Sequence, residues 1–209
     1  MSISQLLVTA FTAARQRQTD LPTKWVQISV RLGGLLPASL LMASVQREGE
    51  ADALIRCLED EMAERVRSKN ISDMFAGHYL NIMTTYWIGG IYEILRLLRE
   101  RKLVDGNEFI GLLKDFELLR MPLEKHEIAK DWDLEEPVKF VKFPRNNNAT
   151  DEYVYDPQDS KRGHIMPMGV SERGSMTWHV VDMKGGAERW IERRSLSDRI
   201  LELWGSEAS

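Results

Sequence analysis

The sequence predicts an α+β protein with a helical core, and two observations carry this prediction. Between about residues 50 and 134, apolar residues recur every three or four positions, which is the spacing of one face of an α-helix. After residue 133, short runs rich in Val, Phe and Tyr alternate with turn segments rich in Asn, Asp, Gly and Pro, as in short antiparallel strands. We therefore expect a helical bundle packed beside a small antiparallel sheet, in a single domain that covers residues 1–209.

Three helices are predicted in the middle of the chain, at about residues 54–66, 72–102 and 108–119. The second of them contains Gly89 and Gly90, and each glycine costs a helix about 1 kcal/mol relative to alanine. A close approach by another helix is the usual reason to tolerate that cost. We therefore expect tight packing at this glycine pair.

The amino-terminal part of the chain holds two further apolar segments. Residues 3–18 carry apolar side chains at helical spacing and are predicted to form a helix. The run from Leu40 to Val45 fits a helix or a strand, and its periodicity does not decide between them. No basic residue precedes the first apolar run, so the segment is not expected to be a signal peptide.

The small sheet is predicted to draw on both flanks of the helical part. Residues 24–32 alternate apolar and polar side chains, which indicates a half-buried strand. Its apolar face would carry Val26, Ile28, Val30 and Leu32. We expect this strand to pair with the β-rich part, residues 135–185. The chain is then predicted to end in a helix over residues 187–204, opened by a capping box that starts at Ser195.

The composition excludes some functions and a membrane span. The 28 basic and 32 acidic residues leave a formal charge of -4, so the chain as a whole does not attract nucleic acid or an anionic membrane. A single cysteine, Cys57, cannot form an intrachain disulfide, and it favours a reducing, cytoplasmic location. The most apolar stretch, residues 74–98, is interrupted by polar and charged side chains, so we expect a core helix there.

Common catalytic and nucleotide-binding signatures are missing from the sequence. It contains no GxGxxG, GxxxxGK[ST], GxSxG or HExxH pattern. The four histidines have no spacing that demands a shared metal ion. The sequence therefore predicts no cofactor and no metal site.

The strongest catalytic candidate is the run RMPLEKH, which places Arg120 and His126 six residues apart. Pro122 lies between them. Proline disfavours helix in the residue before it but suits the first turn of a new helix. The run is therefore predicted to be a junction between two helices.

In this run the chain resembles the HEPN superfamily of helical bundles, many of which are metal-independent ribonucleases with an arginine closely followed by a histidine. The resemblance covers about residues 50–134. It implies that His126 acts as general base or acid on the RNA 2′-hydroxyl or on the leaving oxygen, and that Arg120 holds the scissile phosphate. Histidine titrates near neutral pH and arginine forks onto phosphate oxygens, which suits both roles. It also implies a homodimer that brings two such motifs to one cleft.

If the chain binds RNA, four further basic residues are candidates for substrate contact. Lys125 lies inside the motif, and Lys139, Lys142 and Arg145 form a stretch of one sign without interleaved acids. The first function hypothesis is therefore a HEPN-like endoribonuclease or RNA-binding protein of the toxin or defence type.

A second hypothesis assigns the same residues to structure. Arg120 is also at helical spacing from Glu117 and Glu124, and His126 can be a half-buried histidine beside Glu127. On this interpretation the chain is a non-catalytic α+β module that binds a protein partner or a small ligand. The sequence leaves both hypotheses open.

Overall fold

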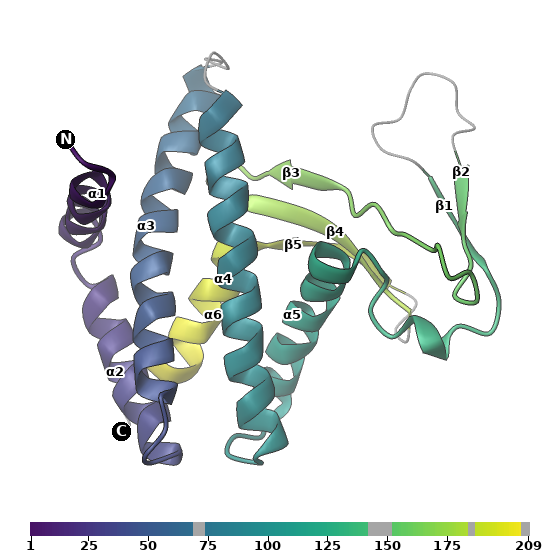
Figure 1. The fold of residues 1–209 in the computed structure, drawn as a ribbon, viewed down its shortest axis with the longest axis horizontal. Coiled ribbons are helices and arrows are strands. Elements are labelled where there is room, and N and C mark those ends of the chain that lie inside the picture. The colour runs from purple at the N-terminus through teal and green to yellow at the C-terminus, as the bar shows by residue number, and fades with distance from the viewer. Residues whose placement is uncertain (69–73, 142–151, 184–186, 206–209) are drawn as a thin grey trace.

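The computed structural model describes residues 1–68, 74–141, 152–183 and 187–205 (Figure 1). Over these ranges the protein is α+β, with six α-helices and two small antiparallel sheets. The helices are α1 (Ile3–Arg17), α2 (Leu21–Leu35), α3 (Leu41–Ser68), α4 (Met74–Glu100), α5 (Asn107–Lys125) and α6 (Arg193–Gly205). The strands are β1 (Val138–Val141), β2 (Glu152–Tyr155), β3 (Met168–Val170), β4 (Met176–Asp182) and β5 (Ala187–Glu192). None of the helices in these ranges is long and apolar enough to cross a membrane.

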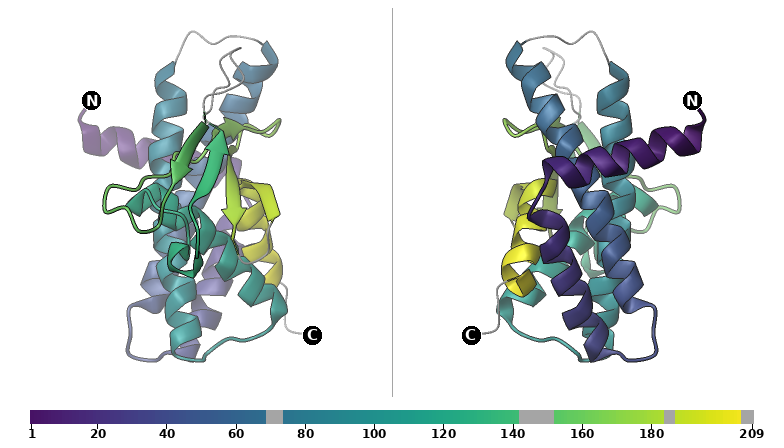
Figure 2. Two further views of the ribbon diagram at one scale, coloured as in Figure 1. Left: turned by 90° about the vertical axis from the view of Figure 1, so that its right-hand side faces the viewer. Right: turned by 90° about the vertical axis from the view of Figure 1, so that its left-hand side faces the viewer.

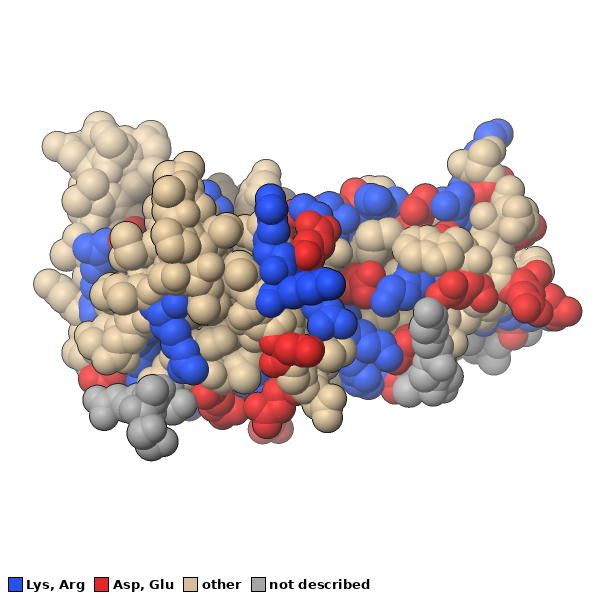
Figure 3. All heavy atoms as spheres, turned by 90° about the horizontal axis from the view of Figure 1, so that it is seen from below, with Lys and Arg blue, Asp and Glu red and all other residues tan. Residues whose placement is uncertain are grey.

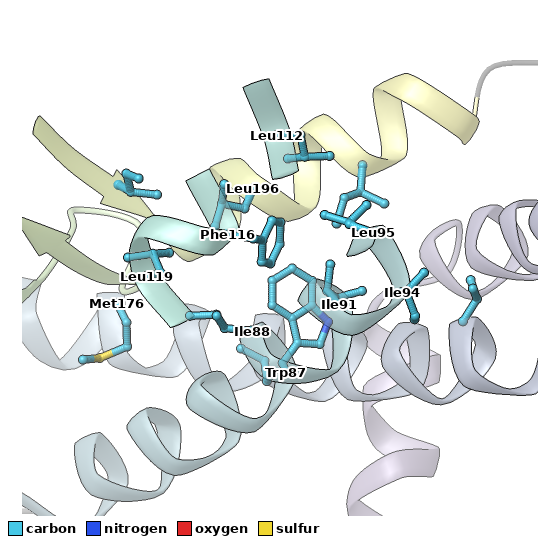
Figure 4. Packing of buried hydrophobic residues seen from close by; sticks show 14 of the residues in the cluster. Trp87, Ile88, Ile91, Ile94, Leu95, Leu112, Phe116, Leu119, Met176 and Leu196 are labelled. Carbon is cyan, nitrogen blue, oxygen red and sulfur yellow. The ribbon is translucent and has the colours of Figure 1, made fainter. Parts of the chain in front are cut away.

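The two longest helices, α3 and α4, lie side by side and organise the bundle (Figure 1). Helix α2 packs on α3, α5 packs on α4, and α6 contacts both α2 and α5. Figure 4 shows the core between α4, α5 and α6, where the rings of Trp87 and Phe116 pack against each other at a tilt of 50°, with centroids 5.7 Å apart. Leu196 of α6 closes the same cluster. The predicted helical core is confirmed.

The strands form one sheet of three and a separate hairpin. Strand β4 pairs with β3 on one side and with β5 on the other, and its alternate residues Met176, Trp178 and Val180 are buried. Strands β1 and β2 pair with each other, with Val138 opposite Tyr155. This hairpin stands to one side of the bundle, beyond α5 (Figures 1 and 2).

The prediction of a strand at residues 24–32 is wrong, because this segment lies within helix α2. Burial follows the helical period, at Leu21, Trp25, Ile28, Ser29 and Leu32. Val26 and Val30, which share the apolar face of the expected strand, are each about half exposed. The β-rich part therefore pairs with no amino-terminal strand in the described residues.

The prediction of a helix over residues 187–204 is wrong in its first part. Residues 187–192 form β5, and helix α6 begins at Arg193. The hydroxyl of Ser195 bonds the Glu192 carboxylate, so Ser195 does not open the helix as a cap. Pairing with β4 extends the chain here, because it buries Ile191 opposite Trp178.

The run around Pro122 is not a junction between two helices. Helix α5 continues through Pro122 to Lys125 and ends at His126, whose φ of 60° is left-handed. Proline has no N–H, so the helix loses one backbone bond here, in its last turn. The Pro122 carbonyl accepts a bond from the His126 N–H.

A buried network of charges joins α3 to the start of α6. The guanidinium of Arg193, which is fully buried, pairs with Asp52 and with Glu59, both on α3 and also fully buried. It lies over the ring of Trp87 on α4, 5.1 Å from the ring centroid. Hydrogen bonds complete the network, since Ser175 donates to Glu59 at 2.5 Å.

Asp52 is the most heavily bonded member of this network. Its carboxylate accepts bonds from Trp25 Nε1 at 2.9 Å and Ser197 Oγ at 2.8 Å, and it also pairs with Arg56. Burial alone would raise the pKa of Asp52, but the charges of Arg193 and Arg56 hold it below its ordinary value. Asp52 is therefore ionised at neutral pH, and both of its carboxylate oxygens have partners.

Arg193→Met is expected to lower the free energy of unfolding by about 3–5 kcal/mol, because it removes the buried charge that Asp52 and Glu59 share and leaves them only Arg56 and the more distant Arg194. Urea denaturation followed by circular dichroism measures the change. Arg17→Met is the matched control. Arg17 pairs with Glu61 at the surface, so its loss should cost about 1 kcal/mol or less. Equal losses for the two variants would contradict this account of the network.

Candidate ligand-binding site

A groove of about 670 Å³ runs along α4 between the start of α3 and the end of α5. We call it the α4 groove. It combines apolar side chains with two arginines and two glutamates. Its lining consists of Ser39, Leu40, Leu41, Ser44, Arg47, Thr85, Tyr86, Gly89, Gly90, Glu93, Ile94, Leu97, Arg120 and Glu124. Its volume lies in the range of small-molecule sites in proteins.

The glycine pair of α4 makes room for two carboxylates from neighbouring helices. A Cβ atom on Gly90 would lie 2.5 Å from Oε1 of Glu48 on α3, and one on Gly89 would lie 2.7 Å from Oε1 of Glu124 on α5. The sequence predicted a close approach by another helix at these glycines, but the groups that approach are carboxylate side chains and not a helix backbone. Any larger residue at either position would displace a carboxylate.

Arg120 occupies the α5 side of the groove. Its Nε lies 2.7 Å from Oε2 of Glu124, and its Nη2 lies 3.9 Å from Oε1 of Glu93. The guanidinium also lies over the ring of Tyr92, 5.2 Å from the centroid. The buried Nε–H has no well-aligned hydrogen-bond acceptor, so its contact with Glu124 is mainly electrostatic.

Glu48 and Arg47 form the matching pair on the α3 side. The Glu48 carboxylate is 5% exposed and lies 2.8 Å from Nη2 of Arg47, whose side chain extends into solvent. Burial raises the pKa of Glu48, and the bond and charge of Arg47 counteract that rise. Sequence reasoning missed both residues, although the glycine pair marked the position at which Glu48 meets α4.

His126 does not line the α4 groove. Its side chain is exposed at the end of α5, and its carbonyl accepts a 2.7 Å bond from the His164 N–H. Within one chain, the structure therefore does not bring Arg120 and His126 into one pocket. The second hypothesis gave Arg120 two structural partners, Glu117 and Glu124. Arg120 does pair with Glu124, but Glu117 pairs with Lys130 instead.

The other predicted substrate contacts do not gather around the groove. Lys125 and Lys139 are exposed at the end of α5 and on β1, and neither lines the groove. Lys142 and Arg145 lie outside the described residues. Within the described ranges, no group of three or more His, Cys, Asp and Glu side chains is arranged to hold a metal ion.

A second polar cluster attaches the β1–β2 hairpin to the end of α5. Tyr155 donates a 2.7 Å hydrogen bond to Asp131 and accepts one from the N–H of Ile128. His164 Nδ1 forms a 2.7 Å hydrogen bond with the hydroxyl of Tyr153. Burial, with a smaller effect from the charge of His179, lowers the pKa of His164 to about 4. His164 is therefore neutral at physiological pH and acts as a structural residue.

Comparisons with known protein families, with characterised proteins and with solved structures found no match to this chain. The site must therefore be interpreted from its own geometry and chemistry.

The buried His164 should make the protein less stable in mild acid. The unfolded chain takes up a proton at this residue near pH 6.5, whereas the folded protein does so only near pH 4. Stability is therefore full above pH 6.5 and falls as pH decreases toward 4, by at most about 3 kcal/mol from this group.

Urea denaturation at a series of pH values tests this expectation. His164→Gln keeps a polar side chain that does not titrate, so its stability should depend less on pH between 4 and 6.5. An unchanged pH profile in the variant would show that His164 is not the group responsible.

Proposed function

We propose that the chain is a non-catalytic ligand-binding module and that the α4 groove is its site. One observation carries this proposal: a helix accepts two consecutive glycines so that carboxylates from both flanking helices fit against it beside an open groove. Helix propensity disfavours glycine at both positions. A function of the groove would account for glycine at both positions.

The lining of the groove favours an organic cation with an apolar part. Arg47 and Arg120 are balanced in number by Glu93 and Glu124. Arg47 is also paired with Glu48 behind the groove, so Glu93 is the carboxylate with most access to a ligand. Leu40, Ile94 and Leu97 supply apolar contact, and the ring of Tyr86 is largely exposed. A cation is attracted both to carboxylates and to the face of an aromatic ring.

The proposal is tested with three probes of one shape: 2-phenylethylamine, 3-phenylpropanoate and 3-phenylpropanamide. The amine should raise the melting temperature of the protein more than the acid or the amide at equal concentration. Glu93→Gln should weaken amine binding by about tenfold, because it removes one charge-assisted bond. Differential scanning fluorimetry and isothermal titration calorimetry measure the two effects.

Glu100→Gln is the matched control. Glu93 and Glu100 are both on α4, both pair with Arg96 and both are about half exposed, but only Glu93 lines the groove. Glu100→Gln should therefore bind the amine as the wild type does. Preference for the acid, or an equal loss in both variants, would rule out the proposed ligand class.

The second candidate function is the HEPN-like ribonuclease. The observation that favours it is the exposed ring of His126 at the end of the helix that carries Arg120, after two long packed helices. In this proposal the Arg120 of one chain acts with the His126 of another in a homodimer. A cytoplasmic location, which the single Cys57 favours, would give such an enzyme access to RNA.

Incubation of the purified protein with single-stranded and structured RNA in the presence of EDTA tests this candidate. Metal-independent cleavage that His126→Ala abolishes and His78→Ala preserves would support it, since both histidines are exposed and only His126 belongs to the motif. Absence of cleavage by the folded wild-type protein, with amine binding intact, leaves the binding module as the function.

A further inference from the structure

The guanidinium of Arg120 has few hydrogen-bond partners for a group that is mostly buried. Its side chain is 22% exposed, and its one hydrogen bond within the described residues is a weak contact of 3.9 Å from Nη1 to the sulfur of Met121. The buried Nε–H lacks an aligned acceptor, and Nη2 lies 3.9 Å from Oε1 of Glu93, too far for a hydrogen bond. Buried donors are normally satisfied, and a guanidinium has five. Those of Arg120 are therefore available to an acceptor from outside the chain.

Arg162 shows how an equally buried arginine is satisfied by the chain itself. Its side chain is 24% exposed, close to the value for Arg120. Its Nε bonds Asp131, its Nη2 pairs with Glu127 at 3.0 Å, and its Nη1 donates to the carbonyl of Asp159. Seen from below, basic and acidic side chains also lie next to one another over the right-hand half of the molecule (Figure 3). The missing acceptors of Arg120 are therefore a property of the α4 groove and not of arginines in this protein generally.

Glu93, which faces Arg120 in the groove, has one carboxylate oxygen to spare. Arg96 bonds Oε2 of Glu93 through Nε at 3.0 Å and Nη2 at 2.7 Å. Among the residues that the structure describes, Oε1 has only its long contact with Arg120. An acceptor on α4 and a set of donors on α5 thus lie side by side in one groove without a hydrogen bond between them.

We propose that the ligand of the α4 groove is a zwitterion, namely an α-amino acid with an apolar side chain. This inference rests on the proposed function, because it uses the same groove and the same cation contact at Glu93. The ammonium of the ligand donates to Oε1 of Glu93, and its carboxylate accepts bonds from the two Nη groups of Arg120. An α-amino acid carries both charges on one carbon atom, so they are neighbours, as the charges of Glu93 and Arg120 are.

The surroundings of Arg120 prepare it for this role. One face of its planar guanidinium lies over the ring of Tyr92, 5.2 Å from the centroid, and that ring offers no acceptor in the plane of the N–H groups. On the Nε side, Oε2 of Glu124 lies 2.7 Å away. These contacts hold the group in place and leave its Nη edge open toward Glu93. A planar guanidinium fixed in this way suits two parallel bonds to a carboxylate.

The apolar side chain of the ligand has a place on the same stretch of α4. Leu97 follows Glu93 by one helical turn and lies on the same face of the helix, and Ile94 lines the groove beside it. Leu40, at the start of α3, is 80% exposed and also lines the groove. The volume of about 670 Å³ accommodates a side chain as large as that of phenylalanine. The groove is therefore polar at Glu93 and apolar beyond it, as an amino acid requires.

A carboxylate suits this place better than a phosphate group does. The guanidinium of Arg120 lies close to two carboxylates, those of Glu93 and Glu124. A phosphate group carries up to about two negative charges at neutral pH, so both carboxylates would repel it. The single charge of an amino acid carboxylate comes with its own ammonium, which offsets that repulsion.

The proposal is tested by isothermal titration calorimetry at pH 7 with L-phenylalanine, L-phenylalaninol and 2-phenylethylamine. All three carry the same ring and an ammonium, and only phenylalanine has a carboxylate. Phenylalanine should bind about tenfold more tightly than the two amines, because it adds a charge-assisted bond to Arg120. Equal or weaker binding of phenylalanine would overturn the zwitterion and leave the cation site of the proposed function intact. Absence of binding by all three would overturn the proposed function, and this inference with it.

Arg120→Gln distinguishes contact with the ligand from a purely structural role. It should weaken the binding of phenylalanine about tenfold, because the carboxylate loses its partner. It should strengthen the binding of 2-phenylethylamine about twofold, because a positive charge beside the ammonium is gone. A purely structural role would weaken both ligands alike, and that result would overturn the assignment of Arg120. The comparison of the three ligands on the wild type stands even where this variant does not fold.

Arg99→Gln is the matched control. Arg99 is on α4, is about half exposed and pairs with Asp105, but it does not line the groove. This variant should bind phenylalanine and 2-phenylethylamine as the wild type does. A loss of phenylalanine affinity equal to that in Arg120→Gln would show that the effect comes from the overall charge of the protein, and it would overturn the proposed contact. Circular dichroism checks that each variant is folded.

Discussion

The fold depends on the burial of Arg193 between Asp52 and Glu59. None of these three charges could be buried alone, because each would lose its hydration without compensation. The two carboxylates are seven residues apart on α3 and therefore face the same side of that helix. Arg193 lies where β5 ends and α6 begins, so one ion network fixes α3, the three-stranded sheet and α6 relative to one another. Its contact with Trp87 adds α4 to the same unit.

This core unit holds the helices around the α4 groove in place, while the ion pairs at the rim of the groove can rearrange. Helices α3 and α4 are held at the Arg193 network, and α5 is held against α4 by the packing around Phe116. The rim pairs of the groove, such as Arg120 with Glu93, are partly exposed and contribute little to stability. Rearranging them around a ligand therefore costs little. The same rearrangement in the Arg193 network would cost several kcal/mol, about as much as the loss of a buried ion pair.

The sequence predicted secondary structure well where an apolar pattern was long. It did not predict contacts between residues that are far apart along the chain. Helix α4 was predictable because its apolar residues keep one period over 27 residues. Residues 24–32 were misassigned because alternation and helical spacing coincide at Ile28 and Leu32, and the valines that completed the alternation face solvent. The groove was predictable only at its glycines. Glu48 and Glu124 approach them from two different helices, and no local spacing reveals that meeting.

The continuity of α5 through Pro122 bears most directly on function. On an unbroken helix, residues six positions apart point about 120° away from each other around the axis. Arg120 accordingly faces the α4 groove, whereas His126 ends the helix in a left-handed conformation and its ring is exposed elsewhere. A junction at Pro122 could have turned both side chains toward one phosphate, and the continuous helix cannot. Joint action of the two residues therefore requires a second chain that approaches from the α5 side.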